Sequence, residues 1–186
     1  MLYDSYFKNP KDVPLLLGKI REYSDQTGPV RLMEICGTHT MSIARSGIRS
    51  VLPENVQLLS GPGCPVCVTP SNMIDMVLDL SQRSGVLITS YGDLLRVPGS
   101  SQGDSLLARR ADGGKVESVY SPMDALKIAE ERPDTEVIFL GVGFETTAPG
   151  TAACILEAAA RGLKNFSVLC LLKRTEPAIR SLIESD

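Results

Sequence analysis

Two short motifs hold most of the residues in this sequence that could carry out metal or redox chemistry. They are Cys36-Gly37-Thr38-His39 and Gly61-Pro62-Gly63-Cys64-Pro65-Val66-Cys67, and together they contain three of the five cysteines and the single histidine. Thiolates and imidazoles bind soft transition metals, and thiols are also redox centres. The two motifs therefore indicate a site that handles a transition metal, a disulfide or both.

The second motif contains a Cys-x-x-Cys pair, Cys64 and Cys67. This spacing gives a minimal loop for a reversible disulfide, and Pro65 restricts that loop. We expect a helix to begin near Pro70, and its free N–H groups would favour a thiolate close by. The same spacing also forms one half of many structural zinc sites, so a redox pair and a zinc knuckle both remain open.

The first motif places a cysteine at the end of an expected strand, Val30 to Ile35. A cysteine in that position can expose its sulfur, and Gly37 lets the backbone turn directly after Cys36. His39 could ligate a metal, orient a substrate or increase the thiolate content of Cys36.

Three arrangements remain open from the residues alone. Cys36, His39, Cys64 and Cys67 have the spacing of a Cys₃His structural zinc site. Cys36 and His39 could instead be the nucleophile and base of a thiol hydrolase or transferase, although no third, orienting group is identifiable. In the third arrangement, Cys36 binds iron as a thiolate beside a redox-active dithiol formed by Cys64 and Cys67.

A glycine-containing segment near residue 143 adds an acidic candidate. Glu145 follows the clearest apolar strand, and it could carry a proton, bind a ligand or favour a helix N-terminus. Thr146 and Thr147 could cap the helix that follows. Cys154 and Cys170 lie in apolar surroundings, which predicts that both are buried.

The elements that position these motifs alternate between short apolar strands and amphipathic helices. Strands are expected at 30–35, 56–59, 86–89, 116–120, 137–140 and 168–172, and helices at 10–27, 70–80, 106–110, 122–132, 151–161 and 177–184. This order predicts an α/β fold, with a doubly wound, mostly parallel sheet and helices on both faces. We expect one α/β domain over residues 1–135, and the start of a second, incomplete α/β domain over 136–186. Since ligands bind at the carboxyl edge of such sheets, the motifs that follow the strands should meet there.

Composition excludes several classes of function. The net charge is −3, so the sequence lacks the basic surface expected of a nucleic-acid-binding protein. No apolar run reaches the ~20 residues of a membrane span, and the first residues do not resemble a signal peptide. We therefore expect a cytoplasmic protein, in which cysteines stay reduced unless they are catalytic, redox-active or metal-bound.

Taken together, the motifs resemble the hydrogenase maturation factor HypD family. The matching segments are Met33–Thr40, Gly61–Pro70, Tyr91–Asp93 with Arg96–Ser100, Tyr120–Leu126 and Gly143–Pro149. These segments follow one another in the order of the family pattern, and the likeness covers nearly the whole sequence.

The resemblance implies a scaffold on which the Fe(CN)₂CO centre of [NiFe]-hydrogenases is assembled, with thiol redox activity rather than conventional enzymatic turnover. The site residues that it implies are Cys36 for the iron, Cys64 and Cys67 for the redox dithiol, and His39, Glu145 and Thr146 along the cleft. It also implies two partners, a HypC-like small chaperone and a HypE-like protein that supplies cyanide.

The sequence departs from the family pattern in two places. Chains of the family are about twice as long, and their C-terminal part carries cysteines that bind a [4Fe–4S] cluster, whereas no cysteine follows Cys170 here. The family also usually has His-Lys and a Pro-Pro pair after the last strand, where this sequence reads Leu172-Lys173-Arg174-Thr175-Glu176-Pro177. The resemblance is therefore to the N-terminal half of the family.

Overall fold

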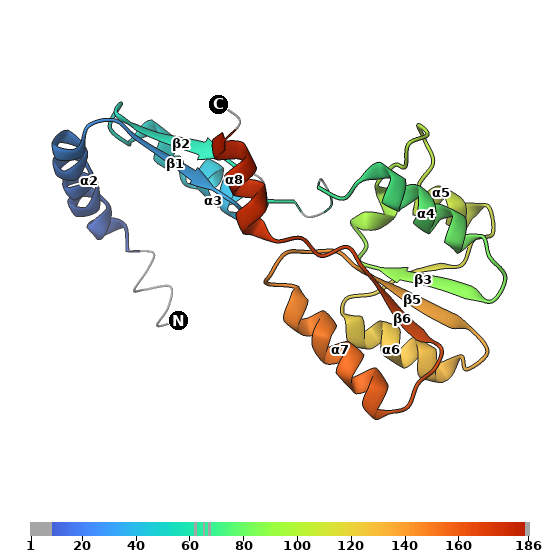
Figure 1. The fold of residues 1–186 in the computed structure, drawn as a ribbon. Coiled ribbons are helices and arrows are strands. Elements are labelled where there is room, and N and C mark those ends of the chain that lie inside the picture. Colours follow the sequence, from blue (N-terminus) through green and yellow to red (C-terminus); the bar gives the residue numbers. More distant parts are fainter. Residues whose placement is uncertain (1–8, 62, 65, 67, 185–186) are drawn as a thin grey trace. The chain divides into compact units, whose positions relative to one another are not determined.

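A computed structural model describes residues 9–61, 63–64, 66 and 68–184 of the chain. The chain divides into two compact units, Met1–Cys64 and Pro65–Asp186 (Figure 1). Each unit is an α/β arrangement with parallel strands, as the sequence predicts.

The first unit is built around one strand–helix–strand crossover. Its elements are η1 (Pro10–Asp12), α2 (Val13–Thr27), β1 (Val30–Glu34), α3 (Gly37–Ser46), η2 (Ile48–Ser50) and β2 (Val56–Ser60). Strands β1 and β2 pair in parallel, with Glu34 opposite Ser60 at their last residues. Because the strands run in the same direction, the segments that follow them leave from the same edge of the sheet.

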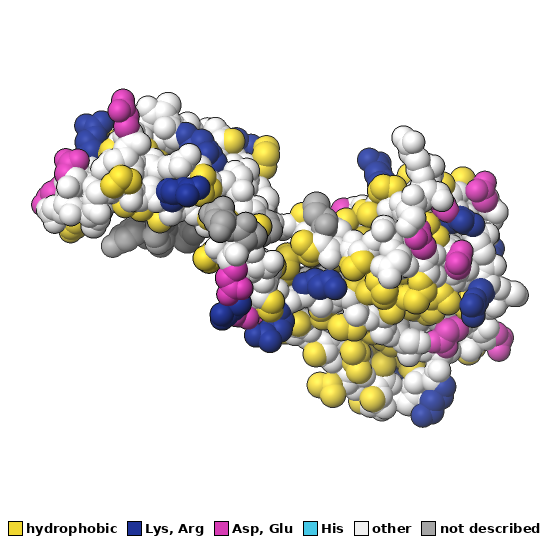
Figure 2. Space-filling model, turned by 45° about the horizontal axis from the view of Figure 1, so that its top comes forward, with side chains coloured by type: hydrophobic (Ala, Val, Ile, Leu, Met, Phe, Trp, Pro, Cys, Tyr) yellow, Lys and Arg dark blue, Asp and Glu magenta, His cyan; other side chains and the backbone are white. Residues whose placement is uncertain are grey.

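The described apolar side chains of this first unit remain partly or fully exposed (Figure 2). Leu32 and Met33 of β1 are 52% and 44% exposed, and Met41 of α3 is 53% exposed. Among its described residues, no hydrophobic side chain is buried. Its local geometry therefore depends more on backbone pairing and polar contacts than on a hydrophobic core.

The second unit contains a four-stranded parallel sheet with helices on both faces. Its strands are β3 (Val86–Ser90), β4 (Val116–Ser118), β5 (Glu136–Gly141) and β6 (Phe166–Cys170), in the order β4-β3-β5-β6. Its helices are α4 (Ser71–Ser81), η3 (Leu94–Arg96), α5 (Leu106–Ala111), α6 (Pro122–Glu131), α7 (Ala148–Ala160) and α8 (Thr175–Glu184). Helices α4 and α5 cover one face of the sheet, and α6 and α7 cover the other (Figure 1).

Alternating side chains of the central strand β5 supply both layers of this core. Val137 and Phe139 are fully buried against the α6 side, and Leu140 is fully buried on the α4 side. This alternation follows from the two-residue period of a strand that is covered on both faces. The second unit therefore has the doubly wound core that the apolar strands predict.

A domain boundary was expected between residues 135 and 136, but the two units divide elsewhere. Strand β5 begins at Glu136 and pairs with β3, where Val86 lies opposite Glu136 and Thr89 lies opposite Phe139. Residues on both sides of position 135 therefore belong to one sheet, and the division falls between Cys64 and Pro65.

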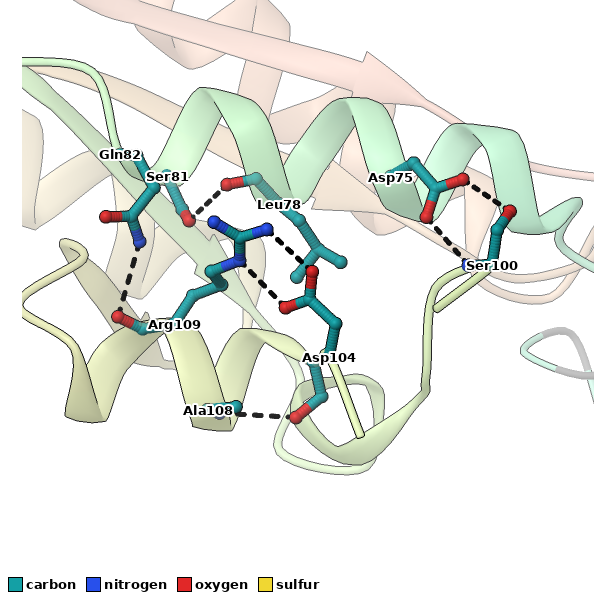
Figure 3. Close-up of polar contacts among 9 residues, drawn as sticks. Asp75, Leu78, Ser81, Gln82, Ser100, Asp104, Ala108 and Arg109 are labelled. Carbon is teal, nitrogen blue, oxygen red and sulfur yellow. Dashed lines mark hydrogen bonds and ion pairs between the residues drawn. The ribbon is translucent and has the colours of Figure 1, made fainter. Parts of the chain in front are cut away.

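Polar contacts fix the segment between η3 and α5 against the neighbouring helices (Figure 3). The backbone N–H and the hydroxyl of Ser100 donate to Asp75 of α4 at 2.7 and 2.5 Å. Arg109 of α5 donates twice to Asp104, at 2.8 and 2.6 Å. Each carboxylate has a lowered pKa, mainly because of its hydrogen bonds from Ser100 and Arg109 respectively.

Candidate functional site

The thiol of Cys36 lies at the N-terminus of α3, in a setting that stabilises its anion. Cys36 is the N-cap residue of this helix, with an extended backbone, and its side chain is partly buried. The backbone N–H groups of His39 and Thr38, together with the Thr38 hydroxyl, lower the pKa of the Cys36 thiol, although partial burial opposes them. Free N–H groups at a helix start favour negative charge in this way, so Cys36 has the environment of a nucleophilic or metal-binding thiolate.

The residues around Cys36 are held by a second set of polar contacts. The Thr40 hydroxyl donates to Glu34 Oε1 at 2.8 Å, and the Thr40 backbone N–H donates to the Cys36 carbonyl at 3.0 Å. Burial alone would raise the pKa of Glu34, but the Thr40 hydrogen bond and the positive charge of Arg49 contribute to a net lowering. Arg49 in turn donates to the Leu58 carbonyl at 2.6 Å.

The start of the Cys-x-x-Cys loop packs directly on the Cys36 segment. The Gly61 N–H donates to the Glu34 carbonyl at 2.8 Å, which extends the strand pairing by one residue. At Gly63, a Cβ atom would lie 2.7 Å from the Cα of Cys36, a distance that only a glycine permits. Cys64 follows at once and is exposed. The structure therefore brings the Cys36 motif and the start of the second motif together in one unit, whereas Cys67 lies outside the described residues.

His39 lies in the first turn of α3, and its side chain is exposed. Its backbone N–H, rather than its imidazole, is the group that lowers the pKa of the Cys36 thiol. Among the residues described by the structure, no group of three or more His, Cys, Asp or Glu side chains is placed to hold a metal ion. The zinc arrangement includes Cys67, so one of its four ligands lies outside that description.

In the second unit, several motif residues line a cavity of about 290 Å³ beyond the carboxyl ends of β3 and β5. The lining residues are Val66, Tyr91, Asp93, Leu94, Val142 and Thr147. Burial raises the pKa of Tyr91, and the nearby charge of Asp93 adds to this effect. Within this unit, three motif segments therefore meet at the carboxyl edge of the sheet, as expected. They are the segments at Val66, at Tyr91 to Asp93 and at Val142 to Thr147.

Both oxygens of the Glu145 carboxylate are engaged at the start of α8. Oε1 accepts from the Thr175 backbone N–H at 2.8 Å, and Oε2 accepts from the Thr175 hydroxyl at 2.6 Å. The hydroxyl bond is the largest cause of the lowered pKa of Glu145. The adjacent Thr146 is an exposed turn residue, and Thr147 precedes α7 without a side-chain capping bond. Glu145 therefore makes a structural contact. Its carboxylate lies at the N-terminus of α8, which begins thirty residues further along the chain.

The two remaining cysteines differ from each other. Cys154 is fully buried, as expected, its Sγ lies 3.2 Å from the Pro122 carbonyl, and burial raises the pKa of its thiol. Cys170 was also expected to be buried, but it is exposed. It is the last residue of β6, an edge strand of the described sheet.

The contacts of Glu34, Thr40 and Arg49 around the Cys36 segment were not predicted from the sequence. Glu34 lies two residues before the Cys36 motif and Thr40 follows it directly, so closeness to the motif and the resemblance of the segment Met33–Thr40 were the available signals. The role of Arg49 depends on strand pairing, since it reaches the carbonyl of Leu58 in β2.

Comparisons with known proteins identify the family of the chain. A family model named HypD, described as "Hydrogenase formation hypA family", matches residues 12–186. The chain belongs to the HypD family. It is 47% identical over 186 residues to hydrogenase maturation factor HypD2 of Bradyrhizobium diazoefficiens, covering 100% of this chain and 48% of that protein.

Two other members of the HypD family show the same extent of similarity. Hydrogenase maturation factor HypD of Azotobacter vinelandii is 46% identical, with 98% of this chain and 48% of that protein covered. The HypD of Escherichia coli is 43% identical, with 99% of this chain and 50% of that protein covered. The chain thus spans about half the length of the curated relatives it matches. Across the helices that the structure describes, none has the length and apolar character needed to cross a membrane.

Proposed function

We propose that this chain contributes to hydrogenase maturation as part of a scaffold for the Fe(CN)₂CO centre of [NiFe]-hydrogenase. In this proposal, Cys36 binds the iron of the assembling centre through its thiolate. A HypC-like small chaperone shares the iron, and a HypE-like protein supplies cyanide. The names of the relatives, all hydrogenase maturation factors, support the general role.

One observation carries the proposal for Cys36. Its thiol lies at the N-terminus of α3, where the backbone N–H groups of His39 and Thr38 lower its pKa. A deprotonated thiolate is the form of cysteine that binds iron, and a lower pKa makes that form more abundant at neutral pH.

The packing of Gly63 on Cys36 supports a role for the adjacent dithiol. Oxidation of Cys64 and Cys67 to a disulfide releases two electrons and two protons, which this proposal assigns to the assembling centre and its surroundings. The chain is then an assembly factor with thiol redox activity rather than an enzyme with conventional turnover.

The proposal is tested by producing the chain together with its HypC-like and HypE-like partners and recording infrared spectra. Iron-bound CO and CN⁻ absorb where protein does not, and we expect these bands with the unaltered chain. Cys36→Ala should abolish them, whereas Cys170→Ala, which removes another exposed thiol, should leave them unchanged. Bands retained in Cys36→Ala would contradict the role of Cys36.

Metal analysis of the purified chain separates this proposal from a structural zinc site. We expect no stoichiometric zinc, and no unfolding when a chelator is added. One tightly held zinc per chain, with loss of folding on chelation, would favour the zinc arrangement instead.

A further inference from the structure

We propose that Glu34 and Thr40 form a positioning pair that holds Cys36 in the orientation needed to bind a metal. This inference rests on the proposed role of Cys36. Neither residue belongs to the two chemical motifs, and neither touches the iron in this proposal. They act through the backbone of Cys36 and the first turn of α3.

The contacts of Thr40 connect the two sides of the Cys36 segment. Its hydroxyl donates to Glu34 Oε1 at 2.8 Å and lies 3.3 Å from the Cys36 carbonyl. Its backbone N–H donates to the same carbonyl at 3.0 Å. The hydrogen bonds therefore tie the end of β1, the N-cap residue and the first turn of α3 into one closed loop.

The sheet also holds Glu34 in place. Its carbonyl accepts the N–H of Gly61 at 2.8 Å, and its side chain lies near Arg49, whose charge favours the carboxylate. Its Oε2 atom is buried, and a hydrogen bond from the Ser60 hydroxyl of β2 adds to that of Thr40 in favouring the carboxylate. Contacts from both β2 and α3 therefore hold Glu34 beside Cys36.

This pair matters because the first unit has little else to fix the Cys36 segment. No hydrophobic side chain is buried among the described residues of that unit, so packing alone does not set the orientation of the thiol. Residues that orient a metal ligand without touching the metal typically change metal affinity by about 10–100-fold when they are replaced. We expect Thr40 to act at the lower end of that range.

The test uses Co(II) as a probe of the Cys36 thiolate. Thiolate-to-cobalt charge-transfer absorption is recorded during titration of the whole chain with Co(II), and the spectrum of Cys36→Ala is subtracted. The difference isolates the part of the signal that depends on Cys36. This signature reports the metal–sulfur bond itself, so a change in overall stability does not alter it while the chain stays folded.

Thr40→Val keeps the shape of the side chain but removes the hydroxyl, and it should weaken Cys36-dependent Co(II) binding about tenfold. Thr40→Ser restores the donor and should bind as the unaltered chain does. Thr27→Val is the matched control, because it removes a hydroxyl that bonds to the Tyr23 carbonyl within α2. It should also bind as the unaltered chain does.

Glu34→Gln provides a second measurement if Thr40→Val does not fold. An amide oxygen accepts a weaker hydrogen bond than a carboxylate, so this variant should show a smaller loss of affinity in the same direction. Unchanged Co(II) binding in the folded Thr40→Val or in Glu34→Gln would overturn the positioning pair alone. Absence of a Cys36-dependent band in the unaltered chain would instead overturn the proposed role of Cys36, and the inference with it.

Discussion

The close packing of Gly63 on Cys36 makes Gly63→Ala the sharpest test of this structure. The added Cβ would lie 2.7 Å from the Cα of Cys36 and from the N of Gly37, and 2.9 Å from the carbonyl carbon of Cys36. Carbon atoms in contact are normally at least ~3.5 Å apart, so the two segments would have to separate by about 0.8 Å. All three neighbouring atoms belong to the backbone and cannot rotate away.

We expect the substitution to destabilise this region by about 1–3 kcal/mol, the usual cost of forcing extra atoms into a packed contact. Gly37→Ala is the matched control, because Gly37 also adjoins Cys36 but has no atom within 4 Å of its added Cβ. Its φ is not positive, so alanine fits the backbone there. This control should leave stability unchanged, or raise it by up to about 1 kcal/mol.

Amide hydrogen exchange measures the effect locally. The relevant protons are the N–H of Thr40, bonded to the Cys36 carbonyl, and the N–H of Gly61, bonded to the Glu34 carbonyl. A loss of 1–3 kcal/mol should speed their exchange by about 5–150-fold in Gly63→Ala. Equal protection in Gly63→Ala and Gly37→Ala would refute the packing of the second motif on the first.

Three further predictions concern single side chains. Phe139→Ala should lower the free energy of unfolding of the second unit by about 3–5 kcal/mol in urea denaturation, because Phe139 is fully buried. The Glu145 carboxylate has a lowered pKa in the folded chain, so it should stabilise α8 at neutral pH, and this stabilisation should be lost as the pH falls through that pKa. The helicity of α8, measured by NMR chemical shifts, should therefore fall at acidic pH. Glu145→Gln should remove this pH dependence. His39→Ala should preserve the pH profile of Cys36 alkylation, because the backbone N–H of residue 39 remains. His39→Pro removes that N–H and should shift the profile to higher pH.

The local parts of this architecture were predictable from the sequence. Alternating apolar strands and amphipathic helices indicated parallel sheets, and the structure contains them in both units. The same pattern placed Cys36 and Gly61 directly beyond two parallel strands, where the structure has them. Burial of Cys154 also followed from its Ala-rich helix. These features depend on a few neighbouring residues, and local patterns encode them.

Long-range pairing was not predictable in the same way. Strand β5 joins β3 across nearly fifty residues, which places the sequence on both sides of position 135 in one sheet. Glu145 reaches Thr175, and nothing near Glu145 marks that partner. Cys170 is exposed at the end of the edge strand β6, and its apolar neighbours in the sequence did not indicate this.

Backbone groups largely supply the environment for the chemistry that was expected from the types of side chain. The single histidine of the chain contributes its N–H to the Cys36 thiol, and the glycine before the Cys-x-x-Cys pair allows the loop to reach the Cys36 backbone. The positions of these backbone N–H donors depend on where α3 begins. Residues that fix the start of α3 therefore become as important as the thiol itself. Glu34 and Thr40 fix it with hydrogen bonds, because the first unit does not bury hydrophobic side chains among its described residues. A search for functional residues based on reactive side chains alone therefore finds Cys36 and misses the pair that orients it.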